Sequence, residues 1–439
     1  MFRFPRKLWP TACFLLAIAS VQVAHAQRVS REWIDGQLGD LVELYRHFHQ
    51  HPELSLAEKE TSARLAGELE SLGIKVTTGV GGYGVVGVLE NGPGDCVMIR
   101  ADMDALPVTE ETGLVYASQV TVEDESGAEV GVMHACGHDV HITCLVGVAR
   151  YLAAHKGDWS GTIVFLGQPA EERVSGAAAM LKDGLFEKFP KPDYALALHC
   201  ESNLLAGHVG CRGGYVLANT DSVDVIMRGR GGHGSAPHTT IDPILQAAYL
   251  VVDLQSIVTR EINPTSPAVI TVGSIHGGTK HNIIGDDCHL QITVRSYSDE
   301  VRARLLSAIR RKATAVAASF GAPEPTIEVT DGTYAMYNDD KLVERLMPVW
   351  KQELGDERVE LDEPVMGGED FSLYGRAGVP ICMFRLGTID AERSARFKQL
   401  GQTLPSLHSA KYYPEAEPAI ATGVRAMAAA VLNLLPKSQ

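Results

Sequence analysis

The densest group of metal-ligating residue types lies in one nine-residue segment, Met133 to His141. It contains one cysteine, three histidines and one aspartate, and it precedes a predicted helix. Cys136 and His138 offer a thiolate and an imidazole two residues apart, a pair that suits a soft-to-borderline divalent cation. Asp139 is expected to orient a ligand ring from behind. The alternative interpretation is a helix cap with scattered polar residues.

Two pairs of carboxylates follow predicted strands. Glu171 and Glu172 end the segment Gln168 to Glu172, which follows the apolar run Thr162 to Leu166, and Asp102 and Asp104 follow another such run. Neighbouring carboxylates are costly to bury unless a cation shares them. One glutamate could therefore ligate a metal while the other accepts a proton from water. An acidic surface turn is the alternative.

Two further histidines are candidates by position alone. His199 ends the apolar run Tyr194 to His199, and ligand sites of open α/β sheets gather where strands end. A single histidine at a strand end is nevertheless more often structural. His408, near the C-terminus, carries no information by itself.

Most of the chain alternates between apolar runs of strand length and helical stretches. Continuous apolar strands interleaved with helices predict a sheet covered on both faces. The predicted strands are Val85–Leu89, Cys96–Arg100, Thr162–Leu166, Tyr194–His199 and Pro380–Arg385. The predicted helices are Leu41–Leu72, Val140–Ala154 and Gly176–Lys182.

The middle of the chain has a different pattern. Ser222 to Arg228 and His289 to Arg295 alternate with period two, as strands with one wet face do, and Asp299 to Phe320 has the pattern of an amphipathic helix. This order predicts a small two-layer α+β domain inserted into a larger one. The predicted division is a leader over 1–26, catalytic parts over 27–212 and 333–439, and an inserted domain over 213–332.

The first 26 residues have the form of a secretory signal peptide. Basic residues precede an apolar run, and Ala24 to Ala26 closes the segment in A-x-A form, which predicts cleavage before Gln27 and a periplasmic or secreted protein. A membrane anchor is the alternative, but the apolar run is too short to span a bilayer. The formal net charge of −15 argues against nucleic acid or an anionic membrane as a partner.

Cysteine usage also bears on the site. The chain has eight cysteines, and Cys13 lies in the predicted leader, so an odd number remains. At least one thiol must then stay free, pair between chains or bind metal.

Taken together, the motifs resemble peptidase family M20, in the subfamily of hippurate hydrolase and auxin-conjugate hydrolases. The resemblance runs from about Leu41 to the C-terminus. The segments that carry it are Phe48–Leu54, Asp102–Pro107, Cys136–Asp139, Pro169–Glu172, Gly231–Gly234, Gly367–Phe371 and His408. It implies a mixed-sheet α/β/α zinc-peptidase-like catalytic domain with an inserted two-layer α+β lid or dimerisation domain.

The same resemblance implies two divalent ions per subunit, zinc or manganese foremost, with cobalt or nickel as alternatives. Glu171 would be the general base, and Asp104 would orient a ligand or hold the electrostatics of the site. The implied metal ligands are Cys136, His138, Glu172, His199 and His408.

The inserted domain would supply the remaining functional residues. His233 corresponds to a lid histidine that polarises the scissile carbonyl, often in the partner subunit of a homodimer. Asn282 and Arg295 correspond to lid residues that hold the substrate's carboxylate, although a mid-strand arginine is otherwise usually a surface ion-pair residue. Gly285 and Ser409 stand where relatives usually carry proline and asparagine, and these departures bear on the acyl preference.

The predicted activity is metal-dependent hydrolysis of the amide bond of N-acyl amino acids. The alternative enzyme is a metallocarboxypeptidase or dipeptidase that releases a C-terminal amino acid by the same chemistry. An alternative of another class is a periplasmic binding protein that kept the fold and lost catalysis. The presence of Glu171 beside all five ligand-type residues argues against that alternative.

Overall fold

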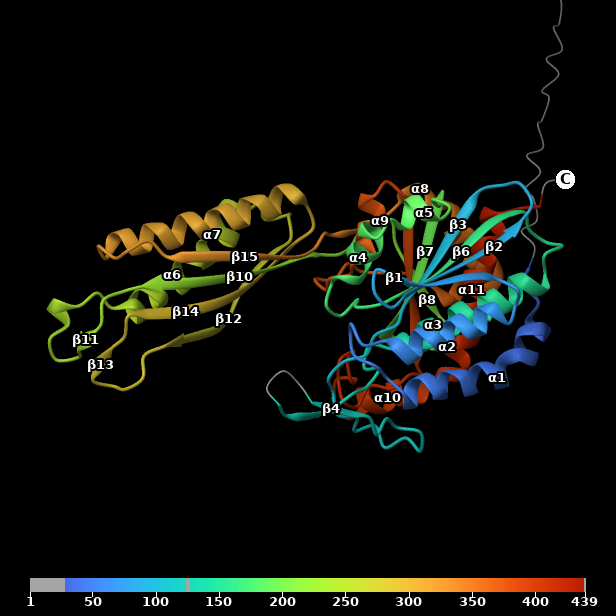
Figure 1. Ribbon diagram of the computed structural model, residues 1–439, viewed down its shortest axis with the longest axis horizontal. Coiled ribbons are helices and arrows are strands. Elements are labelled where there is room, and N and C mark those ends of the chain that lie inside the picture. The colour runs from blue at the N-terminus through green and yellow to red at the C-terminus, as the bar shows by residue number, and fades with distance from the viewer. Residues whose placement is uncertain (1–27, 124–126, 438–439) are drawn as a thin grey trace, which may run out of the picture.

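The protein consists of two units joined by two chain crossings (Figure 1). The computed structural model describes residues 28–123 and 127–437. The predicted leader, residues 1–26, lies outside the described residues. One unit is a large α/β unit, and the other is a smaller, elongated α+β unit that extends away from it (Figure 1).

The large unit is built on an eight-stranded mixed sheet. Its four central strands β6, β3, β7 and β18 run parallel, whereas β1, β2 and β8 pair antiparallel with their inner neighbours. The strands, in sheet order, are β1 (Lys75–Val80), β2 (Gly84–Asn91), β6 (Gly161–Gln168), β3 (Cys96–Asp102), β7 (Tyr194–Leu205), β18 (Ile381–Ile389), β8 (Val209–Cys211) and β17 (Val359–Leu361).

Helices cover both faces of this sheet, which confirms the predicted α/β/α arrangement. One face carries α1 (Arg31–Gln50), α2 (Lys59–Glu70), α3 (His138–Ala154), α8 (Asp340–Leu354) and α11 (Ala416–Leu434). The other face carries α4 (Gly176–Lys182), α5 (Leu185–Lys188) and α9 (Ser372–Arg376). Each face buries its own apolar cluster. Among the described helices, none is long and apolar enough to cross a membrane.

The single helix predicted over Leu41–Leu72 is wrong, because the structure has two helices there. α1 ends at Gln50 and α2 begins at Lys59. His51, which precedes Pro52, has φ −127° and ψ 54°, outside the helical region. A residue before proline is driven out of the α conformation, so Pro52 ends the first helix.

The small unit has two layers, an antiparallel sheet and a pair of helices. The sheet order is β12 (Ala268–Gly277), β14 (Asp287–Ser296), β10 (Asn219–Arg228) and β15 (Thr326–Thr333). The helices α6 (Pro243–Ser256) and α7 (Asp299–Ser319) pack on it around a separate apolar core. Two short strands, β11 (Gly232–His233) and β13 (Ile283–Ile284), pair at the end far from the large unit (Figure 1).

The two crossings between the units lie next to each other. β9 (Gly214–Leu217) leads into the small unit and β16 (Met336–Asn338) leads back, and the two strands pair antiparallel. Met336 and Leu217 are Cα partners in this pair. The small unit is therefore an insertion whose two ends are hydrogen-bonded neighbours.

Candidate metal centre and active site

The candidate site forms where the parallel strands of the large sheet end. β6 leads into Glu171 and Glu172, and β7 contains His199. The connecting loops take unusual backbone conformations, because Ala170 has φ 52° and His408 has φ 68°. Non-glycine residues in this left-handed region are uncommon and are held there by their surroundings.

The structure brings together the five predicted metal ligands. The Sγ of Cys136 lies 3.3 Å from His408 Nε2 and 3.7 Å from His199 Nε2. The Oε1 of Glu172 lies 3.5 Å from His408 Nε2 and 3.8 Å from His138 Nε2. Cys136 and His408 are 272 positions apart in the chain, so only the tertiary fold joins them.

Two of the donor atoms lack hydrogen-bond partners among the described residues. His138 Nε2 and Glu172 Oε1 are buried and have no hydrogen-bond partner in the described structure. The other ring nitrogens are already used, since His138 Nδ1 donates to the carbonyl of Asp104 (2.7 Å) and His199 Nδ1 to that of Cys200 (2.8 Å). Backbone carbonyls orient metal-ligating histidines in this way, so the residues fit a divalent cation.

The buried carboxylates at the site also require a cation to compensate their charge. Burial raises the pKa of Glu172 to about 7, and burial together with Glu369 raises the pKa of Glu171 well above its usual range. Burial likewise lowers the pKa of His199 well below its usual value, which keeps its ring in the neutral form that ligates metals. Two adjacent buried carboxylates are stable as anions only if a positive charge compensates them.

Asp104 positions the loop that carries the two glutamates. Its carboxylate oxygens accept hydrogen bonds from the backbone N–H of Glu171 (3.1 Å) and of Glu172 (3.0 Å). The hydroxyl of Ser55 donates to the same carboxylate at 2.6 Å. Asp104 therefore acts through the loop and through the ring of His138, and it is itself almost fully buried.

The expectation that Asp139 orients a ligand ring is wrong. Its Oδ2 pairs instead with Nδ1 of His49 at 2.7 Å, and His49 Nε2 also meets Glu110 at 3.2 Å. Asp102, which received no separate role from the sequence, contacts the ring of His141 at 2.5 Å. These pairings depend on side-chain directions that neither motif spacing nor composition contains.

A buried charge cluster behind the site was also missed. The guanidinium of Arg100, in the middle of β3, contacts Asp102 (2.6 Å), Glu369 (2.8 Å) and Asp370 (3.2 Å), and all four side chains are fully buried. One available signal was a charged residue inside an otherwise apolar strand. A second was the pair of acids in the Gly367–Phe371 segment.

Removing the charge of Arg100 should strongly destabilise the large unit. Arg100→Met leaves three buried carboxylates without their cation, which typically costs about 3–5 kcal/mol in the free energy of unfolding. Urea unfolding of the metal-free protein, followed by tryptophan fluorescence, measures this loss, because Trp33, Trp159 and Trp350 all lie in the large unit. Arg150→Met is the control; it breaks a partly exposed pair with Glu68 and should cost under about 1 kcal/mol. Equal losses in the two variants would contradict the role given to the cluster.

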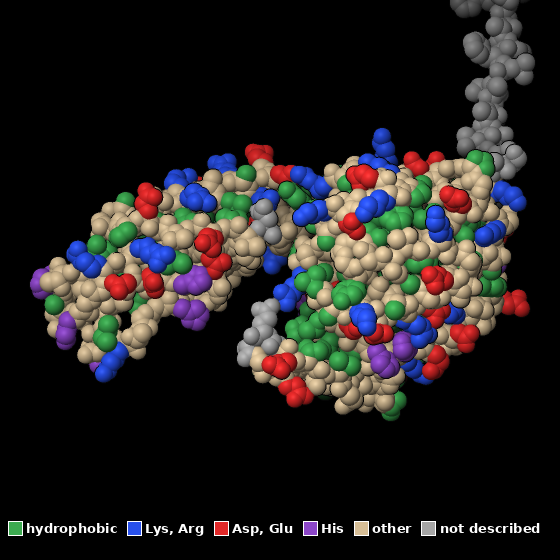
Figure 2. Space-filling model, in the orientation of Figure 1, with side chains coloured by type: hydrophobic (Ala, Val, Ile, Leu, Met, Phe, Trp, Pro, Cys, Tyr) green, Lys and Arg blue, Asp and Glu red, His purple; other side chains and the backbone are tan. Residues whose placement is uncertain are grey.

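A cavity of about 630 Å³ opens at the predicted ligands, between the two units. Glu171 lines it from the large unit and Arg295 from β14 of the small unit. His233 and Asn282 do not line it. Both are exposed, His233 on β11 and Asn282 in the turn just before β13, and Figure 2 shows a hollow between that end of the small unit and the large one.

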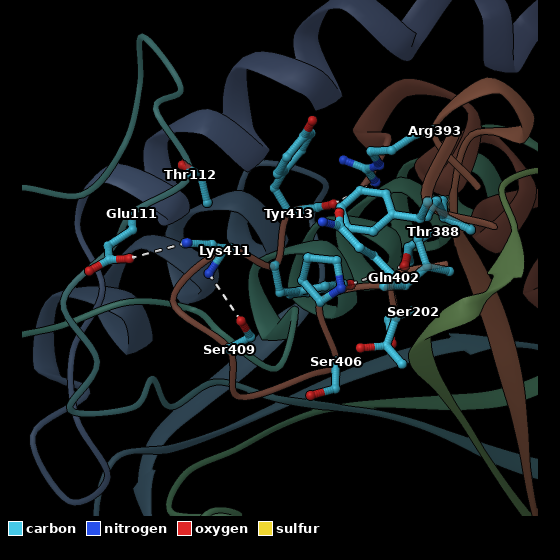
Figure 3. Close-up of a pocket in the computed structure, with 16 residues that line it drawn as sticks. Glu111, Thr112, Ser202, Thr388, Arg393, Gln402, Ser406, Ser409, Lys411 and Tyr413 are labelled. Atoms are coloured by element: carbon cyan, nitrogen blue, oxygen red, sulfur yellow. Dashed lines mark hydrogen bonds and ion pairs between the residues drawn. The ribbon is translucent and has the colours of Figure 1, made fainter. Parts of the chain in front are cut away.

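A second cavity of about 610 Å³ lies beside the loop that carries His408 (Figure 3). Ser406, Ser409 and Lys411 line it, and Arg393 donates there to the carbonyl oxygen of Tyr413 at 2.9 Å. None of the predicted catalytic, substrate-binding or metal-ligating residues lines this second cavity. The chemistry therefore belongs to the first one.

A doubly covered mixed sheet, an inserted α+β unit and a buried thiol–imidazole–carboxylate set at the strand ends define a metal-binding hydrolase. Residues 98–433 match peptidase family M20/M25/M40. The chain belongs to this family of peptidases and amidohydrolases, as the sequence motifs predicted.

Relatives and solved structures agree with this assignment. The chain is 36% identical to thermostable carboxypeptidase 1 of Saccharolobus solfataricus over 85% of this chain and 90% of that one. It is 36% identical to the hippurate hydrolase of Campylobacter jejuni over 76% of this chain and 85% of that one. A dinuclear metal-binding M20 peptidase of Bacillus subtilis superimposes with a TM-score of 0.74 at 26% identity, covering 91% of this chain and 99% of that one.

Proposed function

We propose that the enzyme hydrolyses the amide bond of N-acyl amino acids and binds two divalent ions, zinc or manganese, at Cys136, His138, Glu172, His199 and His408. The observation that carries this proposal is that the five ligand-type side chains form overlapping groups of donor atoms, and that Glu171 belongs to the group with His138 and Glu172 beside a cavity of about 630 Å³. A cavity of this volume accommodates a small molecule. The hippurate hydrolase relative supports the substrate class.

Glu171 is the group that moves protons in this proposal. It is almost fully buried, it lines the cavity, and its neighbour Glu172 faces the histidine ligands. Metal ions bound there would polarise the amide oxygen and make water more acidic. Glu171 accepts the proton of the attacking water and delivers it to the departing amine. Burial raises the pKa of Glu171 above its usual range, and a carboxyl with a raised pKa holds the proton between the two steps.

The remaining parts of the site come, in this proposal, from a second copy of the chain. β12 is an edge strand, and α6 exposes Tyr249 and Val252 with 60% and 74% of their surface accessible. Exposed edge strands and clustered apolar side chains are features of pairing surfaces. Pairing through them would allow His233 and Asn282 to enter the partner's cavity, which neither residue lines within its own chain.

Export completes the proposal. Residues 1–26 would be removed as a signal peptide, so the mature protein would begin at Gln27 in the periplasm or outside the cell. Sequencing the N-terminus of the protein recovered from its native compartment tests this point. A retained Met1 would contradict it.

Activity screening of the metal-loaded mature protein tests the proposed reaction. We expect close to two divalent ions per chain by elemental analysis, and higher kcat/KM for N-acetyl or N-benzoyl amino acids than for dipeptides. Chelation should abolish turnover and metal addition should restore it. The reverse substrate order would favour the carboxypeptidase alternative, which the Saccharolobus solfataricus relative supports. Full activity in metal-free protein would refute both.

A further inference from the structure

Arg385 lies in the wall of the active-site cavity, and the proposed mechanism gives this cation no role. It is the only charged residue of β18, whose other members are apolar or small. Its Cα partner on β7 is His199, one of the predicted ligands. Arg385 also lines the cavity together with His199, Glu171 and Arg295.

The strand pattern explains why its side chain is directed there. Ile381 and Met383 belong to the apolar cluster on one face of the sheet, whereas Cys382 and Phe384 belong to the cluster on the other. Because side chains alternate along a strand, Arg385 shares the face of Ile381 and Met383. It lies one step beyond their apolar cluster, where that face meets the cavity.

The protein itself uses little of this guanidinium. Within the described chain, the one carboxylate at ion-pair distance is Asp362, whose Oδ2 lies 3.6 Å from Nε. That distance exceeds a hydrogen bond, and a guanidinium built to hold a carboxylate does so bidentately at about 2.7–2.9 Å. Asp362 is also shared, because its Oδ1 accepts from the backbone N–H of Glu363 at 3.0 Å.

The terminal nitrogens of Arg385 remain available to a ligand. Apart from the long contact with Asp362, no described residue accepts a hydrogen bond from this side chain, and its terminal nitrogens are absent from the fully enclosed polar atoms that lack a partner. They must therefore reach the cavity, although only 9% of the side chain is exposed. A nearly buried guanidinium with free donors in a ligand cavity is suited to bind a carboxylate of the ligand.

Three arginines line the cavity: Arg295 from the small unit, Arg385 from the large sheet, and Arg173, which already has an interaction within the chain. A simple N-acyl amino acid carries a single carboxylate, for which Arg295 is the predicted partner. We propose that Arg385 determines specificity by binding a second carboxylate of the substrate, so that preferred substrates are N-acyl amino acids with two carboxylates. This inference rests on the proposed amide hydrolysis.

The second carboxylate has two possible sources, the amino-acid side chain or a dicarboxylic acyl group. N-acetylglutamate represents the first, N-succinylalanine the second, and N-acetylglutamine and N-butyrylalanine are their uncharged counterparts. We expect the wild-type enzyme to prefer one dicarboxylic substrate over its counterpart. The identity of that substrate assigns the source.

Arg385→Gln should raise KM for the preferred dicarboxylic substrate about 10- to 100-fold with little change in kcat, since the lost bonds are charge-assisted ones made in the ground state as well. For the uncharged counterpart, KM should change less than about threefold. Arg385→Lys should recover part of the loss. Asp362→Asn is the matched control; it removes the charge of the one described carboxylate at ion-pair distance from Arg385 and should keep the preference.

The outcomes separate the two proposals. If wild-type enzyme cleaves none of the four substrates, the proposed amide hydrolysis of N-acyl amino acids fails. If it cleaves them without preferring a second carboxylate, the inference about Arg385 fails alone. The inference also fails if Arg385→Gln and Asp362→Asn impair both substrates of a pair equally, because Arg385 would then serve only the fold.

Discussion

Glu171→Gln should bind metal as the wild type does and lose about 10²–10⁴-fold in kcat, the usual worth of a general base. The glutamine keeps the size of the side chain and removes its ability to accept a proton. The backbone N–H of residue 171 still donates to Asp104, so the loop should keep its conformation. Steady-state kinetics and elemental analysis on the same preparation measure both quantities.

Glu172→Gln is the matched variant, because it makes the same chemical change at the adjacent position. Oε1 of Glu172 lies 3.8 Å from His138 Nε2 and 3.5 Å from His408 Nε2, and within the described residues it is a buried oxygen beside the predicted ligands. Its replacement should lower metal occupancy, and activity should recover partly when excess metal is added. Equal loss of metal in both variants would show that the division of work between the two glutamates is wrong.

His233→Ala should lower kcat about 10²–10³-fold while changing KM little, as expected for the loss of one donor to a developing oxyanion. His233 is exposed on the β11–β13 pair and does not line the cavity of its own chain. Its effect therefore requires the partner subunit, and dilution below the dimer dissociation constant should abolish wild-type activity.

Mixed dimers test this requirement directly. A dimer of one His233→Ala chain and one Glu171→Gln chain contains one cavity with both an intact Glu171 and an intact His233 from the partner. Such heterodimers, verified by affinity tags on each chain, should regain up to about half of the wild-type activity. His238→Ala, on the same exposed segment, is the control and should leave kcat unchanged. Heterodimers without activity would assign His233 to its own subunit or to structure alone.

The fold class was predictable from local sequence signals, whereas the full ligand set was implied by the resemblance to family M20. Apolar runs such as Thr162–Leu166 can be strands only if both faces are covered, and β6 is buried accordingly. Residue type also restricts chemistry, since a thiol, imidazoles and carboxylates at strand ends have few uses other than metal binding. The fold then brings Cys136 and His408 within 3.3 Å of each other.

The features that the sequence did not predict depend on the direction of side chains or on a single residue that ends a helix. Asp139 follows His138 directly, but on α3 its carboxylate meets His49 of α1, a contact that no spacing rule contains. Pro52 interrupts a hydrophobic pattern that continues on both sides of it, so periodicity alone extends the helix through the break. Arg385 ends an apolar run that predicts a strand, and this pattern does not show that its side chain lines the cavity.

The paired strands β9 and β16 have a consequence for how the chain folds and varies. Leu217 and Met336 are neighbours where the chain leaves and re-enters the large unit. With respect to the large unit, the whole small unit is therefore one long insertion whose two ends are held together. The entropic cost of closing a loop rises only slowly with its length. The length of the insertion should therefore have little effect on how the eight strands of the large sheet assemble. Each unit also has its own apolar core. The proposed pairing surface on the small unit can therefore change in sequence independently of the metal centre, whose ligands all lie in the large unit.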